Sequence, residues 1–139
     1  MIRERTLCIF KPDLTARRAD VAHALIRLLA VDLMPVAMRR DVLSSGQARE
    51  LYREHEGQPY FARNVDFMTS GVSTVLMLEG EQACDRLREM IGATDPAKAA
   101  RGTLRSMFGS DLPRNAVHGS ASVDVAKREI LLFFGGALL

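Results

Sequence analysis

Short apolar runs and helical periodicities alternate along this chain, and the alternation restricts the folds that it can adopt. Residues 6–10 form an apolar run with a β-branched start, and Lys11-Pro12-Asp13 follows them, which predicts a strand that ends in a turn. From Asp20 onward, apolar residues recur at helical spacing, which predicts a helix. Residues 35–42 are predicted to form a second strand, with its proline near the start, where strands tolerate proline.

The middle of the chain continues this alternation. Residues 44–47 have the spacing of a capping box and predict a helix that runs to about residue 55. Pro59 stands where a first helical residue would stand and predicts the start of another short helix. Residues 72–78 are rich in β-formers and predict a third strand, and the apolar spacing over residues 83–91 predicts a further helix.

The last third of the chain begins with a segment of a different kind. Residues 93–119 contain many turn formers and no long period, so we expect an irregular segment with at most a helical turn or two at 103–108. A loop of this length in a compact domain is usually functional or disordered, and its varied composition favours function. Residues 122–128 predict a short helix, and residues 130–134 predict the last strand.

Two halves that are each built as βαβ are typical of the ferredoxin-like split βαβ fold. We therefore expect an α+β domain with a four-stranded antiparallel sheet and helices packed on one of its faces. No linker or repeat divides residues 1–139, so a single domain is expected. With 139 residues, 47% of them apolar, the chain is long enough to bury a core of its own, built without tryptophan.

The charge balance excludes some classes of function. The net charge is only +2, whereas a protein that binds nucleic acid over its whole surface carries a larger basic excess. No apolar stretch approaches the ~18 residues of a membrane span, and charged residues interrupt the first residues, so neither a span nor a signal peptide is expected. Cys8 and Cys84 are too few for a disulfide framework and are predicted to be buried free thiols. Together these features predict a cytoplasmic protein.

Three histidines are the candidates for nucleophilic chemistry, because the chain has no P-loop, no G-x-G-x-x-G and no common zinc motif. His23 lies between apolar positions of a predicted helix, which favours a structural or surface role. His55 is at a predicted helix end, where a basic group is favoured by the helix dipole. His118 is followed by four small residues that leave its imidazole unobstructed, although spacing alone leaves a structural role open.

Seven motifs, in order along residues 5–134, resemble those of nucleoside diphosphate kinases. These motifs are Arg5-Thr-Leu-Cys-Ile-Phe-Lys-Pro-Asp13, Pro59-Tyr-Phe61, Phe67-Met-Thr-Ser-Gly71, Leu78-Glu-Gly80, Gly92-Ala-Thr94, Gly102-Thr-Leu-Arg105 and Asn115-Ala-Val-His-Gly-Ser120. The Lys-Pro-Asp and Asn-x-x-His-Gly-Ser motifs are together highly specific, and the resemblance covers nearly the whole chain.

The resemblance implies a ping-pong transfer of the terminal phosphate of a nucleoside triphosphate, mainly ATP, to a nucleoside diphosphate. It implies that His118 is the covalent carrier, that Glu129 fixes the tautomer of its ring, and that Lys11 and Tyr52 complete the catalytic group. Such a carrier is chemically reasonable, because a neutral imidazole is a nucleophile and a covalent intermediate divides one difficult transfer into two easier steps.

The resemblance also implies a nucleotide site. Lys11, Arg88, Thr94 and Arg105 correspond to groups that contact phosphates, and Asn115 corresponds to a ribose ligand. The remaining positions are a histidine near the phosphates, an aromatic ring that stacks on the base, an apolar residue on the other side of the base, and a glycine after the carrier: His55, Tyr60, Leu112 and Gly119. Mg²⁺ is expected to enter with the nucleotide phosphates, with no protein side chain as its ligand.

Members of this family are homo-oligomers, and the short segment after Phe134 favours a tetramer or dimer over a hexamer. Some positions depart from the family pattern: Ala121 replaces an aspartate, and Gln58, Val72 and Arg101 differ as well. These departures leave a second hypothesis open, a nucleotide-binding regulatory paralogue with low turnover. A nucleic-acid-binding module, suggested by the arginine clusters, is disfavoured by the charge balance.

Overall fold

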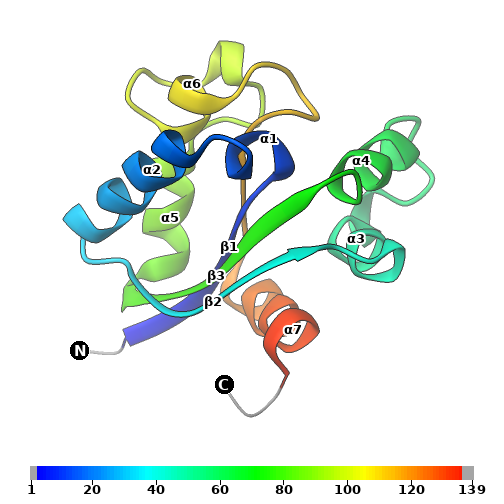
Figure 1. Ribbon diagram of the computed structural model, residues 1–139. Coiled ribbons are helices and arrows are strands. Elements are labelled where there is room, and N and C mark those ends of the chain that lie inside the picture. The colour runs from blue at the N-terminus through cyan, green and yellow to red at the C-terminus, as the bar shows by residue number, and fades with distance from the viewer. Residues whose placement is uncertain (1–2, 136–139) are drawn as a thin grey trace.

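The computed structural model describes residues 3–135, and a four-stranded antiparallel sheet lies at its centre (Figure 1). The strands follow the order β2-β3-β1-β4 across the sheet. Their bounds are β1 (Arg3–Phe10), β2 (Met34–Val42), β3 (Val72–Glu81) and β4 (Val117–Gly119). Each neighbouring pair is antiparallel, so the predicted ferredoxin-like α+β fold is confirmed.

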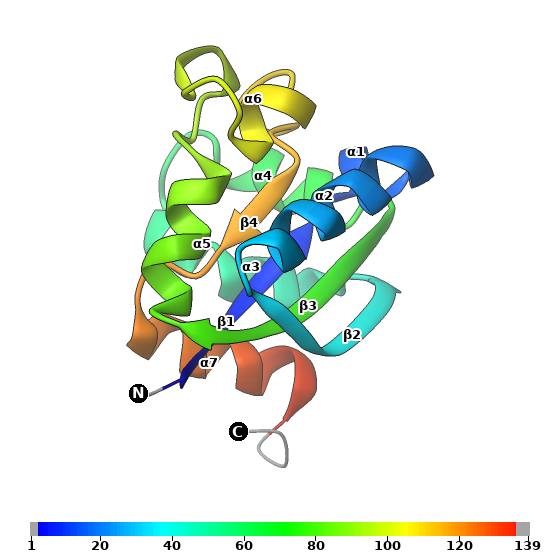
Figure 2. The ribbon, with the colours of Figure 1, turned by 90° about the vertical axis from the view of Figure 1, so that its left-hand side faces the viewer.

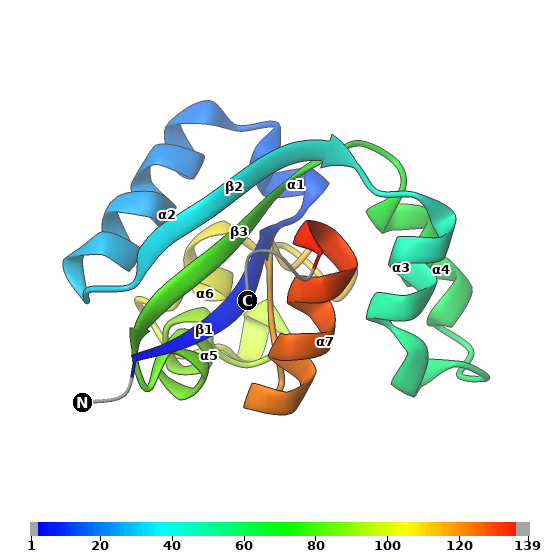
Figure 3. The same cartoon turned by 90° about the horizontal axis from the view of Figure 1, so that it is seen from below.

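The helices cover both faces of this sheet, so the prediction that they pack on one face was wrong (Figure 3). In chain order they are α1 (Pro12–Thr15), α2 (Arg18–Ala30), α3 (Ser45–Leu51), α4 (Phe61–Met68), α5 (Ala83–Ile91), α6 (Leu104–Phe108) and α7 (Val123–Phe134), with the 3-10 turns η1 (Arg53–His55) and η2 (Pro96–Lys98). Within the described residues, none of these helices is long and apolar enough to cross a membrane.

The apolar run of β1 explains why both faces are covered. Cys8 and Phe10 point into one core, which they share with α2, α5 and α6, and Figure 2 shows α2 and α5 on that side. Leu7 and Ile9 point into a second core on the opposite face, which they share with α3, α4 and α7. A strand that is apolar at consecutive positions is buried on both faces, because successive side chains alternate across the sheet. As predicted, Cys8 and the second cysteine, Cys84, are buried free thiols.

The structure corrects the prediction for residues 130–134. Residues 130–134 were expected to be the last strand, but they belong to α7, which also includes the helix predicted at 122–128. Its buried residues Ala126, Glu129, Ile130 and Phe133 recur at helical spacing. The fourth strand is β4, which lies inside the segment expected to be irregular and pairs with β1, so that Ile9 lies opposite His118.

Other elements shift by a few residues. The capping box at 44–47 is present: Ser44 Oγ accepts a hydrogen bond from the backbone of Gln47, and the Gln47 side chain accepts one from the backbone of Ser44. The helix that it begins ends at Leu51 rather than near residue 55, because η1 follows it as a separate 3-10 turn. Helix α4 begins at Phe61, two residues after Pro59.

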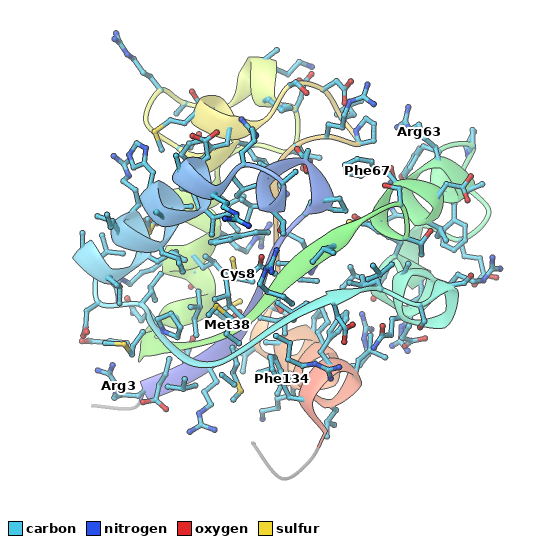
Figure 4. The ribbon with its side chains drawn as sticks, viewed as in Figure 1. Arg3, Cys8, Met38, Arg63, Phe67 and Phe134 are labelled. Atoms are coloured by element: carbon cyan, nitrogen blue, oxygen red, sulfur yellow. The ribbon has the colours of Figure 1, made fainter. Side chains whose placement is uncertain are left out.

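Strand β2 forms one edge of the sheet and exposes apolar side chains. It pairs with β3 on one side only, among the described residues. Met38, labelled in Figure 4, lies on this strand and is 56% exposed. Ile26 of α2 is also exposed, as are the β2 residues Met34, Val36 and Val42. Apolar groups on an open strand edge form a surface suited to association.

Candidate active site

A cleft of about 820 Å³ opens between the segment from α3 to α4, helix α5, the loop that follows α5, and β4 with α7. Every site residue expected from the sequence lines this cleft: Lys11, Tyr52, His55, Tyr60, Arg88, Thr94, Arg105, Leu112, Asn115, His118, Gly119 and Glu129. Since these residues come from separate parts of the chain, the fold itself brings them together. Arg63 also lines the cleft, on the part of α4 labelled in Figure 4.

The hydrogen bond between His118 and Glu129 defines the reactive end of the cleft. His118 Nε2 lies 3.1 Å from Glu129 Oε1, and Ser120 Oγ donates to the same oxygen at 2.6 Å. The Glu129 side chain is 2% exposed, and that of His118 is 17% exposed. With Glu129 accepting from Nε2, that nitrogen carries the proton, and Nδ1 keeps its lone pair for an electrophile.

The position of His118 depends on the close approach of β4 to its neighbours. Its backbone is held in register opposite Ile9 of the buried strand β1. The next residue, Gly119, faces α5, where a Cβ atom would lie 2.6 Å from Ile91 Cδ1. No side chain fits at that distance, so glycine at 119 allows β4 to pack against α5.

Two hydrogen bonds join the Lys-Pro-Asp motif to the segment that leads into β4. The backbone N–H of Lys11 donates to the carbonyl oxygen of Ala116 at 2.8 Å. The backbone N–H of Ala116 donates to Asp13 Oδ2 at 3.0 Å. Ala116 has a φ of 73°, a left-handed conformation that is unfavourable for a residue with a Cβ, and these bonds hold it there.

Lys11 is an unusual cation because it is buried at the floor of the cleft, 5% exposed. Burial and the positive charge of Arg105 lower the pKa of Lys11 to about 7, although Asp13 partly opposes this change. The Lys11 ammonium also lies 5.9 Å from the centre of the Tyr52 ring. Because burial and Arg105 both disfavour the charged form of the Lys11 amine, an anion bound beside it would stabilise that charged form.

The two arginines of the cleft are oriented by backbone carbonyl groups rather than by carboxylates. Arg105 donates from Nη1 to the oxygen of Gly92 at 3.1 Å and from Nη2 to the oxygen of Val117 at 2.9 Å. Arg88 Nη1 donates to the oxygen of Ala121 at 2.9 Å. Across residues 3–135, no ion pair neutralises either guanidinium, so the charge of both is available to a bound anion.

The other end of the cleft is built for a flat, less charged group. The Tyr60 hydroxyl lies 2.9 Å from His55 Nδ1, and Leu112 is 48% exposed. Asn115 Nδ2 donates to the oxygen of Thr94 at 2.9 Å, which ties the segment before β4 to the loop after α5. An aromatic ring and an exposed aliphatic side chain at the walls of one cleft are suited to a stacked ring.

Some residues in and beside the cleft have roles that the sequence did not indicate. Ser120 shares the Glu129 carboxylate with His118, and Asp13 holds Ala116. Ser120 could have been inferred, since it follows the last residue of β4 and residues two apart in an extended chain face the same way. The Glu54 side chain also lines the cleft and accepts a hydrogen bond from Arg128. The described residues contain no cluster of three or more histidine, cysteine or acidic side chains that could hold a metal ion.

Comparison with known proteins agrees with this architecture. A sequence model of the family described as nucleoside diphosphate kinase matches residues 4–138. The chain is 44% identical over 134 residues to a nucleoside diphosphate kinase of Anaeromyxobacter sp. (strain Fw109-5), covering 96% of this chain and 91% of that one. It is 46% identical over 138 residues to one from Methylorubrum populi, covering 99% and 97%.

Solved structures show the same likeness in three dimensions. The nucleoside diphosphate kinase of Aquifex aeolicus superposes with a TM-score of 0.91 at 36% identity, covering 98% of each chain. A halophilic nucleoside diphosphate kinase from Halobacterium salinarum, solved in complex with CDP, superposes with a TM-score of 0.92 at 37% identity, covering 98% of this chain and 90% of that one.

A ferredoxin-like sheet that presents a histidine beside a cleft lined by cations defines a phosphate-handling enzyme. The chain belongs to the nucleoside diphosphate kinase family, and it is therefore a phosphotransferase that acts on nucleotides.

Proposed function

We propose that this enzyme transfers the γ-phosphate of a nucleoside triphosphate, mainly ATP, to a nucleoside diphosphate through a phosphohistidine at His118. The observation that carries the proposal is the bond between His118 Nε2 and Glu129, which leaves Nδ1 unprotonated in a cleft that also holds Lys11, Arg88 and Arg105. A nucleophile surrounded by cations is the arrangement that phosphoryl transfer requires.

In the first half-reaction, the Nδ1 lone pair attacks the γ-phosphorus. The bond from that phosphorus to the β,γ-bridging oxygen breaks, and the nucleoside diphosphate leaves with the electron pair. Glu129 balances the positive charge that develops on the imidazole, since it retains the bond to Nε2–H. In the second half-reaction, a terminal oxygen of another nucleoside diphosphate attacks the phosphorus and Nδ1 leaves, which restores the enzyme.

The cations stabilise the charge that accumulates on the transferred group. Lys11, Arg88 and Arg105 are assigned to the phosphates, with Thr94 beside them. Burial raises the pKa of the Tyr52 hydroxyl, so this group is a hydrogen-bond donor at neutral pH in the cleft that also holds His118.

The residues present fit a magnesium ion that is carried by the nucleotide. Two of the carboxylates in the cleft are already engaged, Glu129 with His118 and Glu54 with Arg128, whereas Arg88 and Arg105 are free to hold the phosphates that would hold the ion. When bound, Mg²⁺ supplies charge neutralisation on the phosphate oxygens, and it favours such oxygens and water as ligands.

The nucleoside is assigned to the outer end of the cleft. Tyr60 and Leu112 would hold the base between them, with His55 nearer the phosphates, while Asn115 and Gly119 lie toward the ribose. Stacking without hydrogen bonds to the base edge favours acceptance of several bases.

Labelling with [γ-³²P]ATP tests the proposal. The wild-type protein should acquire a label that is stable in base and labile in acid, and nucleoside diphosphates should remove it. The variant His118→Ala should acquire none. A wild type that binds nucleotides tightly but transfers no faster than His118→Ala would instead support a regulatory paralogue.

We also propose that the enzyme is a cytoplasmic homo-oligomer, a dimer or tetramer rather than a hexamer. The exposed apolar side chains on the open edge of β2 support association, and the two free thiols suit a reducing compartment. Light scattering of the purified protein measures the oligomeric state, and a monomer or a hexamer would contradict the proposal.

A further inference from the structure

One wall of the cleft is formed by the segment from α3 to α4, which Figure 3 shows beyond the end of β2. This wall runs from α3 through η1 to α4 and carries Tyr52, His55 and Tyr60. Its inner side is anchored by buried apolar residues such as Leu51 and Phe61. The residues of η1 are exposed rather than packed in this core, so their position relative to His118 depends on the polar contacts that η1 itself makes.

Arg128 of α7 makes such a contact. Its Nη1 atom donates to Glu54 Oε1 at 2.9 Å, and in the described part of the chain no other side-chain hydrogen bond or ion pair joins η1 to an element beyond this wall. Figure 3 shows α7 beside α3, on the same face of the sheet. The ion pair therefore joins the exposed turn η1 of the wall to α7.

The partly buried environment of Arg128 costs folding free energy, so a contribution to stability alone does not explain this arginine. Its side chain is 23% exposed, and its Nε and Nη2 atoms are buried without a partner among residues 3–135. Buried donors that are left unpaired cost free energy, and a native structure that keeps them calls for an explanation. Since Arg128 immediately precedes Glu129, the same turn of α7 holds both the wall and the partner of His118.

We infer that Arg128 is a positioning residue, which sets the distance between the nucleotide-holding wall and the nucleophile through its ion pair with Glu54. The inference rests on the proposed function, because it assumes that His118 accepts the phosphoryl group. Without the ion pair, η1 moves relative to α7. A bound nucleotide is then held farther from His118 Nδ1, and less of it is in the productive geometry.

The variant Arg128→Met tests this inference, because it keeps the apolar stem and removes the charge. Two phosphoryl donors separate the possible effects. ATP must be held by the wall, whereas phosphoramidate has no base or ribose and transfers its phosphoryl group to the imidazole nitrogen with release of ammonia. We expect kcat/KM for ATP to fall about 5- to 20-fold, mostly through kcat, while phosphoramidate labels His118 at the wild-type rate.

The chain provides a matched control. Arg17 Nη1 lies 2.9 Å from Asp20 Oδ2 at the start of α2, so Asp20→Asn removes an ion pair of the same kind and length. Neither residue lines the cleft or contacts Glu54, so this variant should resemble the wild type with both donors. Arg128→Lys keeps a cation at the position and should recover part of the loss. Glu54→Gln removes the same ion pair from its exposed side and should reproduce the effect of Arg128→Met even if that variant folds poorly.

The outcomes distinguish this inference from the function on which it rests. If wild-type protein forms no phosphohistidine with ATP, the proposed function fails. If the wild type is labelled but Arg128→Met and Glu54→Gln both keep its kcat/KM for ATP, only the positioning role is overturned. An equal loss with ATP and phosphoramidate in both variants would also overturn it, because the ion pair would then act on the imidazole rather than on the wall.

Discussion

His118 and Glu129 meet through a single 3.1 Å hydrogen bond between an edge strand and a helix, and this bond selects which nitrogen of the imidazole faces the cleft. The same carboxylate oxygen accepts from Ser120, which fixes its orientation. The geometry of the nucleophile therefore depends on a buried carboxylate, that of Glu129.

Glu129→Gln should preserve the shape of this contact but remove its charge. The imidazole then lacks a counter-charge as the phosphohistidine forms, so we expect kcat to fall about 10- to 100-fold. Rapid mixing with ATP measures the rate of enzyme phosphorylation directly. As a control, Glu89→Gln changes an exposed carboxylate of α5 that lines the same cleft, and its kcat is expected to stay within about twofold of the wild-type value. Equal losses of kcat in both variants would contradict this account.

Lys11 should make nucleotide binding depend on pH. Its pKa is lowered to about 7 from an ordinary 10.5, and bound phosphates raise it again, so binding at pH 8 should take up about one proton. Calorimetry in buffers of different ionisation enthalpy measures this uptake. It should disappear in Lys11→Met, and an uptake that persists there would have to come from another group.

The same shift has a consequence for stability in the absence of nucleotide. Between pH 7 and about 10.5, the unfolded chain holds the Lys11 proton that the folded chain has released. The free energy of unfolding should therefore gain a stabilising contribution as pH rises through this window. Urea titrations at several pH values give the slope of the free energy of unfolding against pH for the wild type and for Lys11→Met. Identical slopes would show that Lys11 is not the cause.

The Tyr60 ring and its hydroxyl group can be tested separately. Tyr60→Phe loses the bond to His55 but keeps the ring, and its KM for nucleotides should change by less than about threefold, because an exposed hydrogen bond is worth little. Tyr60→Ala removes the stacking surface and should raise KM by about 5- to 30-fold. Steady-state kinetics decide the point, and equal effects of the two substitutions would assign the role to the hydroxyl.

Met38→Lys tests the open edge of the sheet. A lysine on an edge strand opposes pairing with a second strand, so the variant should dissociate toward the monomer while it keeps its fold, since Met38 is 56% exposed. Light scattering follows the mass and circular dichroism follows the fold. An assembly of unchanged mass would place the interface elsewhere.

Ala116→Val should destabilise the fold. A β-branched residue at a φ of 73°, at a fully buried position, should cost about 2–4 kcal/mol in the free energy of unfolding. Glycine adopts this backbone conformation freely, so Ala116→Gly should stay within about 1 kcal/mol of the wild type. Urea denaturation measures both, and a valine variant as stable as the glycine variant would refute the strain.

Local patterns in the sequence predicted the first three strands and most helices, because their apolar periods extend over enough residues to be recognised. The end of the chain misled the prediction for a physical reason. Residues 130–134 are all apolar, and such a run fits a buried strand as well as a helix. Strand β4 has only three residues, too few to show any period, and it is defined by its pairing with β1.

The site was predicted through family resemblance rather than through local patterns. No spacing along the chain indicates that Lys11, Tyr52 and His118 share one cleft, since the fold brings them together from distant positions. The contact between Glu54 and Arg128 had no sequence signal at all, because it joins two charged residues that are 74 positions apart in the chain. Pairings of this kind become visible only when the elements are placed in space.

The paired hydrogen bonds between Lys11, Asp13 and Ala116 also limit how this chain can exchange segments with a relative. A crossover between residues 13 and 115 would combine a Lys-Pro-Asp motif from one parent with a β4 segment from the other. Each half would then meet a partner selected in a different background, and residues in direct contact do not contribute independently. Functional chimeras are therefore expected to inherit both segments from the same parent, even though 103 positions along the chain separate Asp13 from Ala116.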